Sequence, residues 1–396
     1  MMTGPDSNSK KRKLTSENSD SIKRQRTSKS SFISKRACVQ SNLLNVTQND
    51  WHKANHFFKT HRNETKMSKK NRSLGHSFIR FDNEIIALAN KAMEGTLGEG
   101  AFGVVVAGQC QTGENCAIKI EGGTKRRPNT QEIQVMRKLQ YYLAETSRTL
   151  PTIKNFKGND ISSKRYTALS LRKGKELSQV ISQLNYKQKL ITAIKACEAL
   201  LEVHDKRVIH ADIKANNMIA DVKGNNIHVD TVDYDFSIIL PKNKDYVTDG
   251  WKGTLDYMAP EIAAAIRLPV NAKFSFSSDI YALGQMFILD FKLPKQIFAD
   301  MICLNPQERC TLDKIILKLI NQLSALKNLE DEILQFIHKT KAKYDPNYKS
   351  PASTVNNSAY FLGFTHYLKE TANAFCQKSL DIPTMAKNYI LSYFPR

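Results

Sequence analysis

Closely spaced cysteines are missing from this sequence. Its seven cysteines are scattered through 396 residues, and no C-x-x-C motif occurs. Disulfide frameworks and structural zinc sites both need cysteines at short, regular spacing. The pattern therefore argues against both kinds of site and indicates a reducing compartment.

Long apolar runs are also missing. No stretch approaches the roughly 18 consecutive apolar residues of a membrane-spanning helix, and the N-terminus lacks the apolar centre of a secretory signal. We therefore expect a soluble, intracellular protein with no membrane partner. Hydrophobic residues still make up 41% of the chain, which is enough for the cores of two to three domains.

Acidic residues are scarce near the N-terminus. The whole chain has a formal net charge of +21, and residues 1–80 hold 18 Lys and Arg against 5 Asp and Glu. A polar, charged segment of this kind cannot bury enough apolar surface to offset its ordering entropy. We therefore expect residues 1–88 to form a basic tail, disordered to about residue 75, with a weak helix over residues 43–58.

Two basic clusters lie inside this tail, at residues 10–13 (K-K-R-K) and 23–26 (K-R-Q-R). Their spacing resembles a bipartite nuclear import signal. It predicts an import receptor as a partner and the nucleus as the location, with the cytoplasm as the alternative. The same charge equally suits a solubilising tail or an arm that binds nucleic acid.

Residues 209–218 (I-H-A-D-I-K-A-N-N-M) are the most informative stretch. They place a carboxylate, an ammonium group and a carboxamide close together at Asp212, Lys214 and Asn217. An apolar run precedes them and a β-branched run follows, so we expect a loop between a helix and a hairpin, where catalytic groups are commonly held. The spacing resembles the H-R-D-x-K-x-x-N catalytic loop of protein kinases.

That resemblance implies a role for each of these polar groups. Asp212 would accept the hydroxyl proton of a protein substrate, Lys214 would steady the γ-phosphate of ATP, and Asn217 would hold Mg²⁺. The sequence departs from the family at Ala211, where the arginine of H-R-D is replaced.

A glycine-rich segment, G-E-G-A-F-G, runs from Gly98 to Gly103 between two β-branched stretches. The dinucleotide-binding form of G-x-G-x-x-G opens a helix, whereas these neighbours predict a strand-turn-strand hairpin. This is the form of the kinase glycine-rich loop, in which backbone N–H groups approach phosphates. The resemblance implies the following nucleotide-binding residues: Leu97, Gly98, Glu99, Gly100, Ala101, Phe102, Gly103, Val105, Ala117 and Lys119.

Lys119 ends an A-x-K triplet in an alternating strand, which resembles the kinase strand whose lysine grips the α- and β-phosphates. Its expected ion-pair partner is Glu132, on a helix that Asn129 can cap. Glu132 could instead complete a capping box with Asn129, and Glu121 is the other carboxylate available nearby.

The kinase D-F-G triplet is altered in this sequence. Residues 233–237 read D-Y-D-F-S, so the Mg²⁺ ligand is either Asp233, in a D-Y-D triplet, or Asp235, in D-F-S. The strand alternation before this segment favours Asp233. The D-F match favours Asp235, with Phe236 as the packing aromatic, and we prefer Asp235 by a small margin.

Residues 253–261 (G-T-L-D-Y-M-A-P-E) resemble the end of a kinase activation segment. The pair Lys214 and Thr254 is typical of serine/threonine kinases. Asp279 resembles the aspartate that binds the catalytic-loop backbone, and Arg309 resembles the arginine that pairs with Glu261. Residues 170–175 correspond to the hinge that contacts adenine, and the short interval from Asp279 to Arg309 implies a trimmed substrate-docking region.

The resemblance implies an α+β, bilobal protein-kinase fold. We expect a β-rich lobe over residues 89–175, a helical lobe over 176–325 and a C-terminal helical extension over 326–396. The expected activity is transfer of the γ-phosphoryl group of ATP to Ser or Thr of protein substrates with Mg²⁺. A catalytically silent kinase-fold scaffold is the alternative. The departures from the family's motifs resemble those of kinases of large DNA viruses. The D-Y-D triplet is similar to the D-Y-G triplet of the casein-kinase-like and vaccinia-related branch.

Overall fold

A computed structural model of the chain describes residues 44, 46–68, 76–81, 84–89, 95–99, 103–122, 130–154 and 160–349. The chain divides into two compact units, Met1–Leu319 and Ile320–Arg396. The basic clusters at 10–13 and 23–26, and Gly100, Ala101 and Phe102 of the glycine-rich segment, lie outside the described residues.

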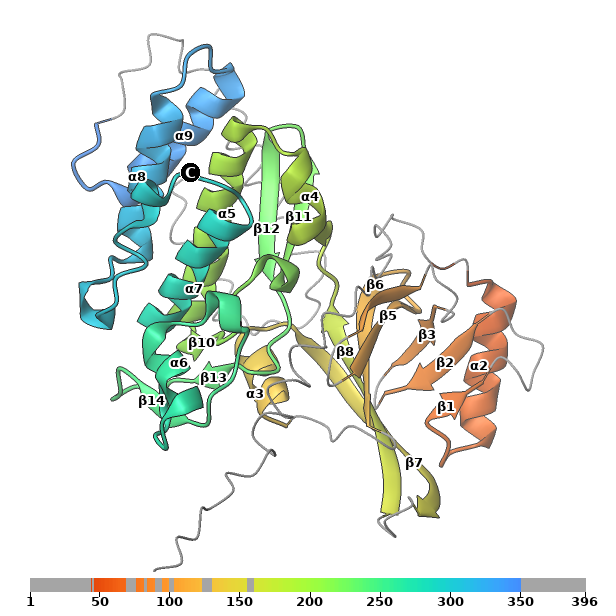
Figure 1. Cartoon of the computed structure of the whole chain (residues 1–396). Coiled ribbons are helices and arrows are strands. Elements are labelled where there is room, and N and C mark those ends of the chain that lie inside the picture. The colour runs from red at the N-terminus through yellow and green to blue at the C-terminus, as the bar shows by residue number, and fades with distance from the viewer. Residues whose placement is uncertain are drawn as a thin grey trace, which may run out of the picture. The chain divides into compact units, whose positions relative to one another are not determined.

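An eight-stranded antiparallel sheet forms the first lobe of the first unit (Figure 1). Its strand order is β1-β2-β3-β5-β6-β8-β7, with β4 paired to β5. The strands are β1 (Lys66–Met67), β2 (Ser77–Arg80), β3 (Ile85–Leu88), β4 (Thr96–Glu99), β5 (Gly103–Cys110), β6 (Asn115–Gly122), β7 (Tyr142–Lys154) and β8 (Asp160–Ser170). One helix, α3 (Thr130–Lys138), follows β6. The predicted glycine-rich hairpin is confirmed as β4 and β5, which pair through Glu99 and Val104.

The prediction of disorder to about residue 75 is wrong for the residues that the structure describes, whereas the helix expected over residues 43–58 is confirmed as α2 (Gln48–Thr60). Helix α2 (Gln48–Thr60) packs through Trp51, Phe57 and Phe58 into a buried cluster with Phe78 of β2. Strand β3, inside the predicted 1–88 tail, pairs with β5 and so belongs to the lobe's sheet. The basic composition of the segment obscured these few large apolar residues, which bury enough surface to order it.

The second lobe of this unit is mainly helical. Helix α5 (Tyr186–Asp205) starts at a capping box between Asn185 and Gln188, and its apolar positions are buried. Helices α4 (Leu177–Val180), α6 (Pro260–Arg267) and α7 (Phe276–Leu289) complete the lobe, and α8 (Leu312–Ser324) begins in it. The lobe also holds a three-stranded sheet in the order β12 (Asn226–Thr231), β11 (Met218–Lys223), β9 (Lys175–Glu176). Two strand pairs accompany it: β10 (Val208–Ile209) with β13 (Ile238–Ile239), and β14 (Val247–Asp249) with β15 (Ala272–Phe274). The observed architecture is α+β and bilobal, as predicted.

The chain between α7 and α8 is short. Residues 290–311, all of which the structure describes, hold only the 3₁₀ turns Lys295–Phe298 and Pro306–Glu308. This agrees with the predicted trimming between Asp279 and Arg309.

The second unit contains the end of α8 and helix α9 (Asp331–Tyr344). Ile333, Ile337 and Thr340 of α9 are buried, and their spacing places them on one face of the helix. A helix was predicted in this region, while residues 350–396 of the predicted extension lie outside the described residues. Among the helices that the structure describes, none is both long and apolar enough to cross a membrane.

Candidate active site

The predicted catalytic loop lies between α5 and strand β11, with β10 at its start. Asp279, in the first turn of α7, fixes its backbone. The Asp279 carboxylate accepts hydrogen bonds from the backbone N–H groups of His210 (2.7 Å) and Ala211 (2.9 Å), and it also pairs with His204 (3.0 Å). Asp279 is buried, so the anchor that the sequence predicted is confirmed.

The polar groups of this loop converge on the Asp212 carboxylate. Lys214 Nζ lies 2.6 Å from Asp212 Oδ2, and Asn217 donates to the same oxygen at 2.9 Å. Thr254 Oγ1 donates to Asp212 Oδ1 at 2.7 Å and accepts from Lys214 Nζ at 2.8 Å. Four residues that the sequence singled out therefore form one hydrogen-bonded cluster.

Thr254 reaches this cluster because the preceding glycine lets the two segments approach closely. Gly253 has a φ of +111°, and a Cβ atom there would lie 2.8 Å from the carbonyl oxygen of Ala211. A side chain at residue 253 would clash with the catalytic loop and would also strain the backbone.

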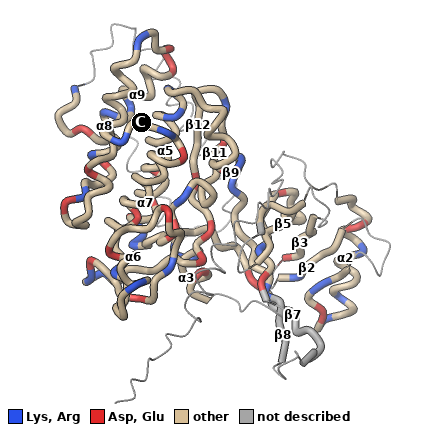
Figure 2. The backbone as a smooth tube through the Cα atoms, in the orientation of Figure 1, with Lys and Arg blue, Asp and Glu red and all other residues tan. Residues whose placement is uncertain are grey.

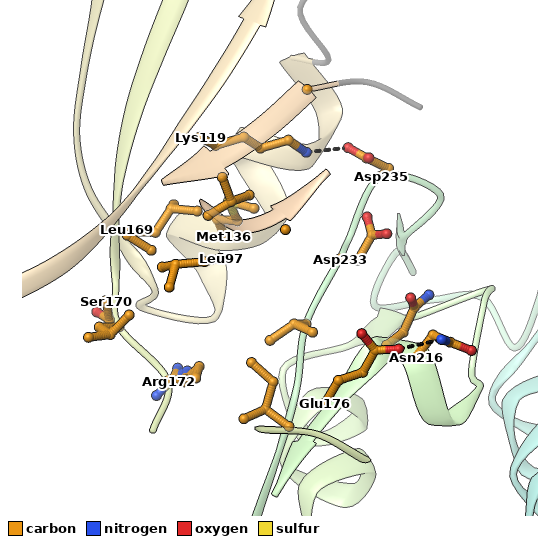
Figure 3. Close-up of a pocket in the computed structure, with 18 of the residues that line it drawn as sticks. Leu97, Lys119, Met136, Leu169, Ser170, Arg172, Glu176, Asn216, Asp233 and Asp235 are labelled. Carbon is orange, nitrogen blue, oxygen red and sulfur yellow. Dashed lines mark hydrogen bonds and ion pairs between the residues drawn. The ribbon is translucent and has the colours of Figure 1, made fainter. Parts of the chain in front are cut away.

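Lys119 lies on β6 and pairs with two carboxylates, of which Figure 3 shows Asp235. Its Nζ is 2.5 Å from Glu132 Oε1 on α3 and 2.6 Å from Asp235 Oδ1. All three side chains are less than a tenth exposed. The predicted Lys119–Glu132 pair is confirmed, while Glu121 pairs with Arg165 of β8 at 2.6 Å.

Electrostatics in this cluster favour a charged lysine. Burial lowers the pKa of Lys119, but Glu132 and Asp235 outweigh that effect, and the net shift is upward. Burial raises the pKa of Asp235 to about 7, against the attraction of Lys119. The three carboxylates of Glu121, Glu132 and Asp235 have oxygens within 4.8 Å of one another. Because Lys119 pairs with Glu132 and Asp235, and Arg165 pairs with Glu121, we interpret the cluster as an ion-pair network with one carboxylate more than its cations.

Tyr234, not Phe236, packs against α3. It is buried in a cluster with Val135 and Met136 of that helix and Leu139 just after it, and its ring lies 5.1 Å from that of His210. Phe236 packs against a different cluster, which contains Ile209 and Ile238. The packing aromatic therefore follows Asp233, which supports the D-Y-D alignment over the D-F-S alignment that we preferred from the sequence.

Asp233 and Asp235 face different partners. Asp235 reaches Lys119, whereas the Asp233 carboxylate points into the cleft (Figure 3). Desolvation by the surrounding protein raises the pKa of Asp233, and the nearby Asp235 carboxylate raises it further. Asp233 also has a φ of +66°, a conformation that aspartate tolerates better than most residues do.

A cleft between the two lobes of the first unit brings together most of the predicted nucleotide-binding residues. Its lining includes Leu97, Gly98, Gly103, Val105, Ala117, Lys119, Glu132, Asn217, Asp233 and Asp235. Side-chain placement of Glu99, like Gly100, Ala101 and Phe102, lies outside the described residues. Asp212 and Thr254 line a smaller adjoining pocket.

The predicted hinge also lines this cleft, through Ser170, Leu171 and Arg172. Gly174, with a φ of +117°, lies so close to the carbonyl oxygen of Ala220 that a Cβ atom there would be 2.3 Å from it. Only glycine fits this approach of the hinge to β11.

Sequence reasoning missed several lining residues, among them Met136, Leu169, Glu176 and Asn216. Glu176 accepts hydrogen bonds from Asn216 and Ser178, and the first of these is drawn in Figure 3. Asn216 adjoins the catalytic loop's Asn217, which was a usable signal. No local pattern marks the others, because the fold alone brings them to the cleft.

An ion pair between Arg309 and Glu261 links two segments of the helical lobe. Arg309 donates to Glu261 through Nη1 at 2.7 Å and Nη2 at 2.8 Å. The Arg309 guanidinium also donates to the backbone carbonyl groups of Cys303 and Ser277. This confirms the predicted pairing and ties the start of α6 to the chain before α8.

Taken together, a cleft with an ion-paired lysine beside a loop with an aspartate, a lysine and an asparagine is the arrangement of the protein-kinase class. The protein kinase domain family matches residues 92–361, and the chain belongs to this family. The family implies use of ATP with a divalent metal.

Similar proteins include serine/threonine and receptor-like kinases. A G-type lectin S-receptor-like serine/threonine-protein kinase of Arabidopsis thaliana is 28% identical over 226 residues, covering 52% of this chain and 25% of that protein. Cysteine-rich receptor-like protein kinase 44 of the same plant is 25% identical over 285 residues, covering 66% of this chain and 70% of that protein. The inhibitor of nuclear factor kappa-B kinase subunit alpha of Gallus gallus is 27% identical over 205 residues, covering 49% of this chain and 26% of that protein.

The chain spans about a quarter of the length of two of these three relatives. Their names support the broad assignment to eukaryotic-type protein kinases. They give no support to the predicted viral origin or to the casein-kinase-like branch.

Proposed function

We propose that this protein is a serine/threonine protein kinase that transfers the γ-phosphoryl group of ATP to Ser or Thr side chains of protein substrates. The observation that carries the proposal is the Asp212 cluster, next to the cleft that contains the Lys119–Glu132 pair. A carboxylate beside a phosphate-gripping cleft is what in-line phosphoryl transfer needs, since catalysis there rests on positioning and charge neutralisation.

Residues of the Asp212 cluster and of the cleft have separate tasks in this reaction. Asp212 orients the substrate hydroxyl and accepts its proton. Lys214, 2.6 Å from Asp212, steadies the phosphoryl group as it moves, and Thr254 holds both side chains in register. Lys119 binds the α- and β-phosphates, and Glu132 keeps its ammonium group pointing into the cleft.

Asp233 and Asn217 fit a magnesium ion. Both line the cleft, and they offer the carboxylate and carboxamide oxygens that Mg²⁺ accepts. Desolvation and, after it, the negative charge of Asp235 raise the pKa of Asp233, so a bound cation would relieve repulsion at this point. When bound, Mg²⁺ neutralises phosphate charge.

The preference for Ser and Thr over Tyr is supported by the contact of Lys214 with Thr254, the combination typical of serine/threonine kinases. The lectin-receptor-like relative is itself named a serine/threonine-protein kinase, which agrees with this specificity. Protein substrates therefore remain the proposed partners, with no particular protein indicated.

The competing function is a silent scaffold of the same fold. Ala211 and the missing glycine after Tyr234 favour it. The intact Lys119–Glu132 pair and the ordered Asp212 cluster favour the active enzyme, because a scaffold has no need of either.

The test replaces the proposed catalytic carboxylate. In Asp212→Asn we expect transfer from labelled ATP to a mixture of basic and acidic test proteins to fall by about 10²- to 10⁴-fold, the range for loss of a general base. Binding of ADP, followed by calorimetry, stays near the wild-type value. The matched control is Asp221→Asn, the same change at a carboxylate that pairs with exposed Lys223.

Labelling that survives in Asp212→Asn contradicts the assignment of Asp212. Wild-type protein that binds ADP but labels none of the proteins supports the scaffold instead.

A further inference from the structure

Lys119 has one more carboxylate partner than its expected role requires. Glu132 already holds it from α3 at 2.5 Å. Asp235 reaches the same ammonium nitrogen at 2.6 Å from a segment 116 residues further along the chain. An ammonium group has three donors, and two of its partners are these carboxylates; Figure 3 shows the contact with Asp235.

Asp235 occupies a position that the fold does not require to be acidic. Tyr234 packs against α3 and Asp233 points into the cleft, so Asp235 takes the place of the glycine in the D-F-G triplet that this segment resembles. A glycine there has no side chain and would not form this ion pair with Lys119. The second carboxylate is therefore a property of this sequence rather than of the fold.

The charges around this contact oppose an incoming anion. Asp235 is faced by Lys119 of β6 and Glu132 of α3, and Asp233 lies two residues before it. Glu121 of β6 also lies close, but Arg165 of β8 neutralises it. Phosphate oxygens that approach Lys119 thus meet the Asp235 carboxylate, 2.6 Å from the Lys119 nitrogen, and like charges repel strongly in a partly buried site.

We propose that Asp235 is an internal competitor of the nucleotide phosphates for Lys119, so that the site discriminates against nucleotide that carries no divalent cation. The inference rests on the proposed function of the cleft. To bind, phosphates must displace the Asp235 carboxylate from Lys119 or arrive with their charge neutralised.

Calorimetry with ADP in the presence of EDTA tests this directly. In Asp235→Asn the side chain keeps its size but loses its charge, and we expect ADP to bind about tenfold more tightly or better, equivalent to about 1.4 kcal/mol. Adenosine, which has no phosphate, binds equally to both proteins. Asp221→Asn, which changes net charge equally at β11, leaves ADP binding unchanged.

A gain in ADP affinity below about threefold, or a loss, overturns the inference. An equal gain for adenosine also overturns it, because the cleft has then changed shape. If Asp235→Asn does not fold, Asp235→Ser provides the same comparison with a smaller neutral side chain. Failure of the wild type and every variant to bind either adenosine or ADP contradicts the proposed function itself.

Discussion

At the scale of single residues, the site is organised by shared acceptors. One oxygen of the Asp212 carboxylate accepts hydrogen bonds from Lys214 and Asn217, and the other accepts one from Thr254. These are charge-assisted hydrogen bonds, which are shorter and stronger than neutral ones. They hold the carboxylate in one orientation before any substrate arrives.

Thr254 is the residue whose contribution can be isolated most cleanly. Thr254→Ala removes a hydrogen bond to a charged group, a loss of about 1.5–3 kcal/mol, so we expect kcat to fall roughly 10- to 100-fold. The KM for ATP stays nearly constant, because Thr254 does not line the nucleotide cleft. Steady-state kinetics measures both values.

Thr254→Ser is the control, since it keeps the hydroxyl group. It should recover most of the lost kcat, and a serine variant no better than the alanine variant shows that the methyl group, not the hydroxyl, is what matters.

At the scale of elements, long-range polar anchors join segments that are remote in sequence. Asp279 of α7 binds the backbone of residues 210 and 211, and Lys119 of β6 meets Glu132 of α3. Arg309 joins the chain before α8 to Glu261 of α6, and its side chain is fully buried. Such pairs contribute little net energy compared with apolar packing, yet removing one partner is strongly destabilising.

Arg309→Leu leaves the Glu261 carboxylate without its cation. We expect the free energy of unfolding to fall by about 3–5 kcal/mol, the usual effect of breaking a buried ion pair, as measured by urea denaturation. As a control, Lys318→Ala removes an exposed pair with Asp300, 36% and 56% exposed, and changes stability by about 0.5 kcal/mol or less. Equal effects of the two substitutions would show that burial does not decide the strength of these pairs.

At the scale of the whole molecule, charge is unevenly distributed along the chain. Residues 1–43 hold ten Lys and Arg against three acidic residues. Along the coloured part of the tube in Figure 2, by contrast, basic and acidic residues are interspersed. Nuclear import and nucleic-acid binding through the clusters at 10–13 and 23–26 stay predictions. Because α2 packs through Trp51 and Phe57 against β2, any test of the tail has to stop before this helix.

Deletion of residues 1–43 is therefore the informative truncation. It should lower the salt concentration at which the protein elutes from a heparin column, because fewer cations are available to displace counterions. Its melting temperature should match that of the full chain. Deletion of residues 1–75, which removes α2 and β1, should lower the melting temperature; unchanged heparin elution of the shorter deletion would assign polyanion binding to another surface.

The sequence by itself determined the class of fold, the catalytic loop, Lys119 and the activation-segment end, because each is a short motif whose residues act within one loop or strand. It also predicted the anchors Asp279 and Arg309. Tertiary structure alone decided which aromatic packs against α3, and hence that Asp233 faces the cleft while Asp235 pairs with Lys119. It also decided that the helix expected over residues 43–58 packs on β2 and that β1–β3 belong to the sheet of the first unit. The physical reason is the same in both cases: the contacts join residues far apart in the chain, and composition or spacing within a short window does not record which distant surface will bury a given side chain.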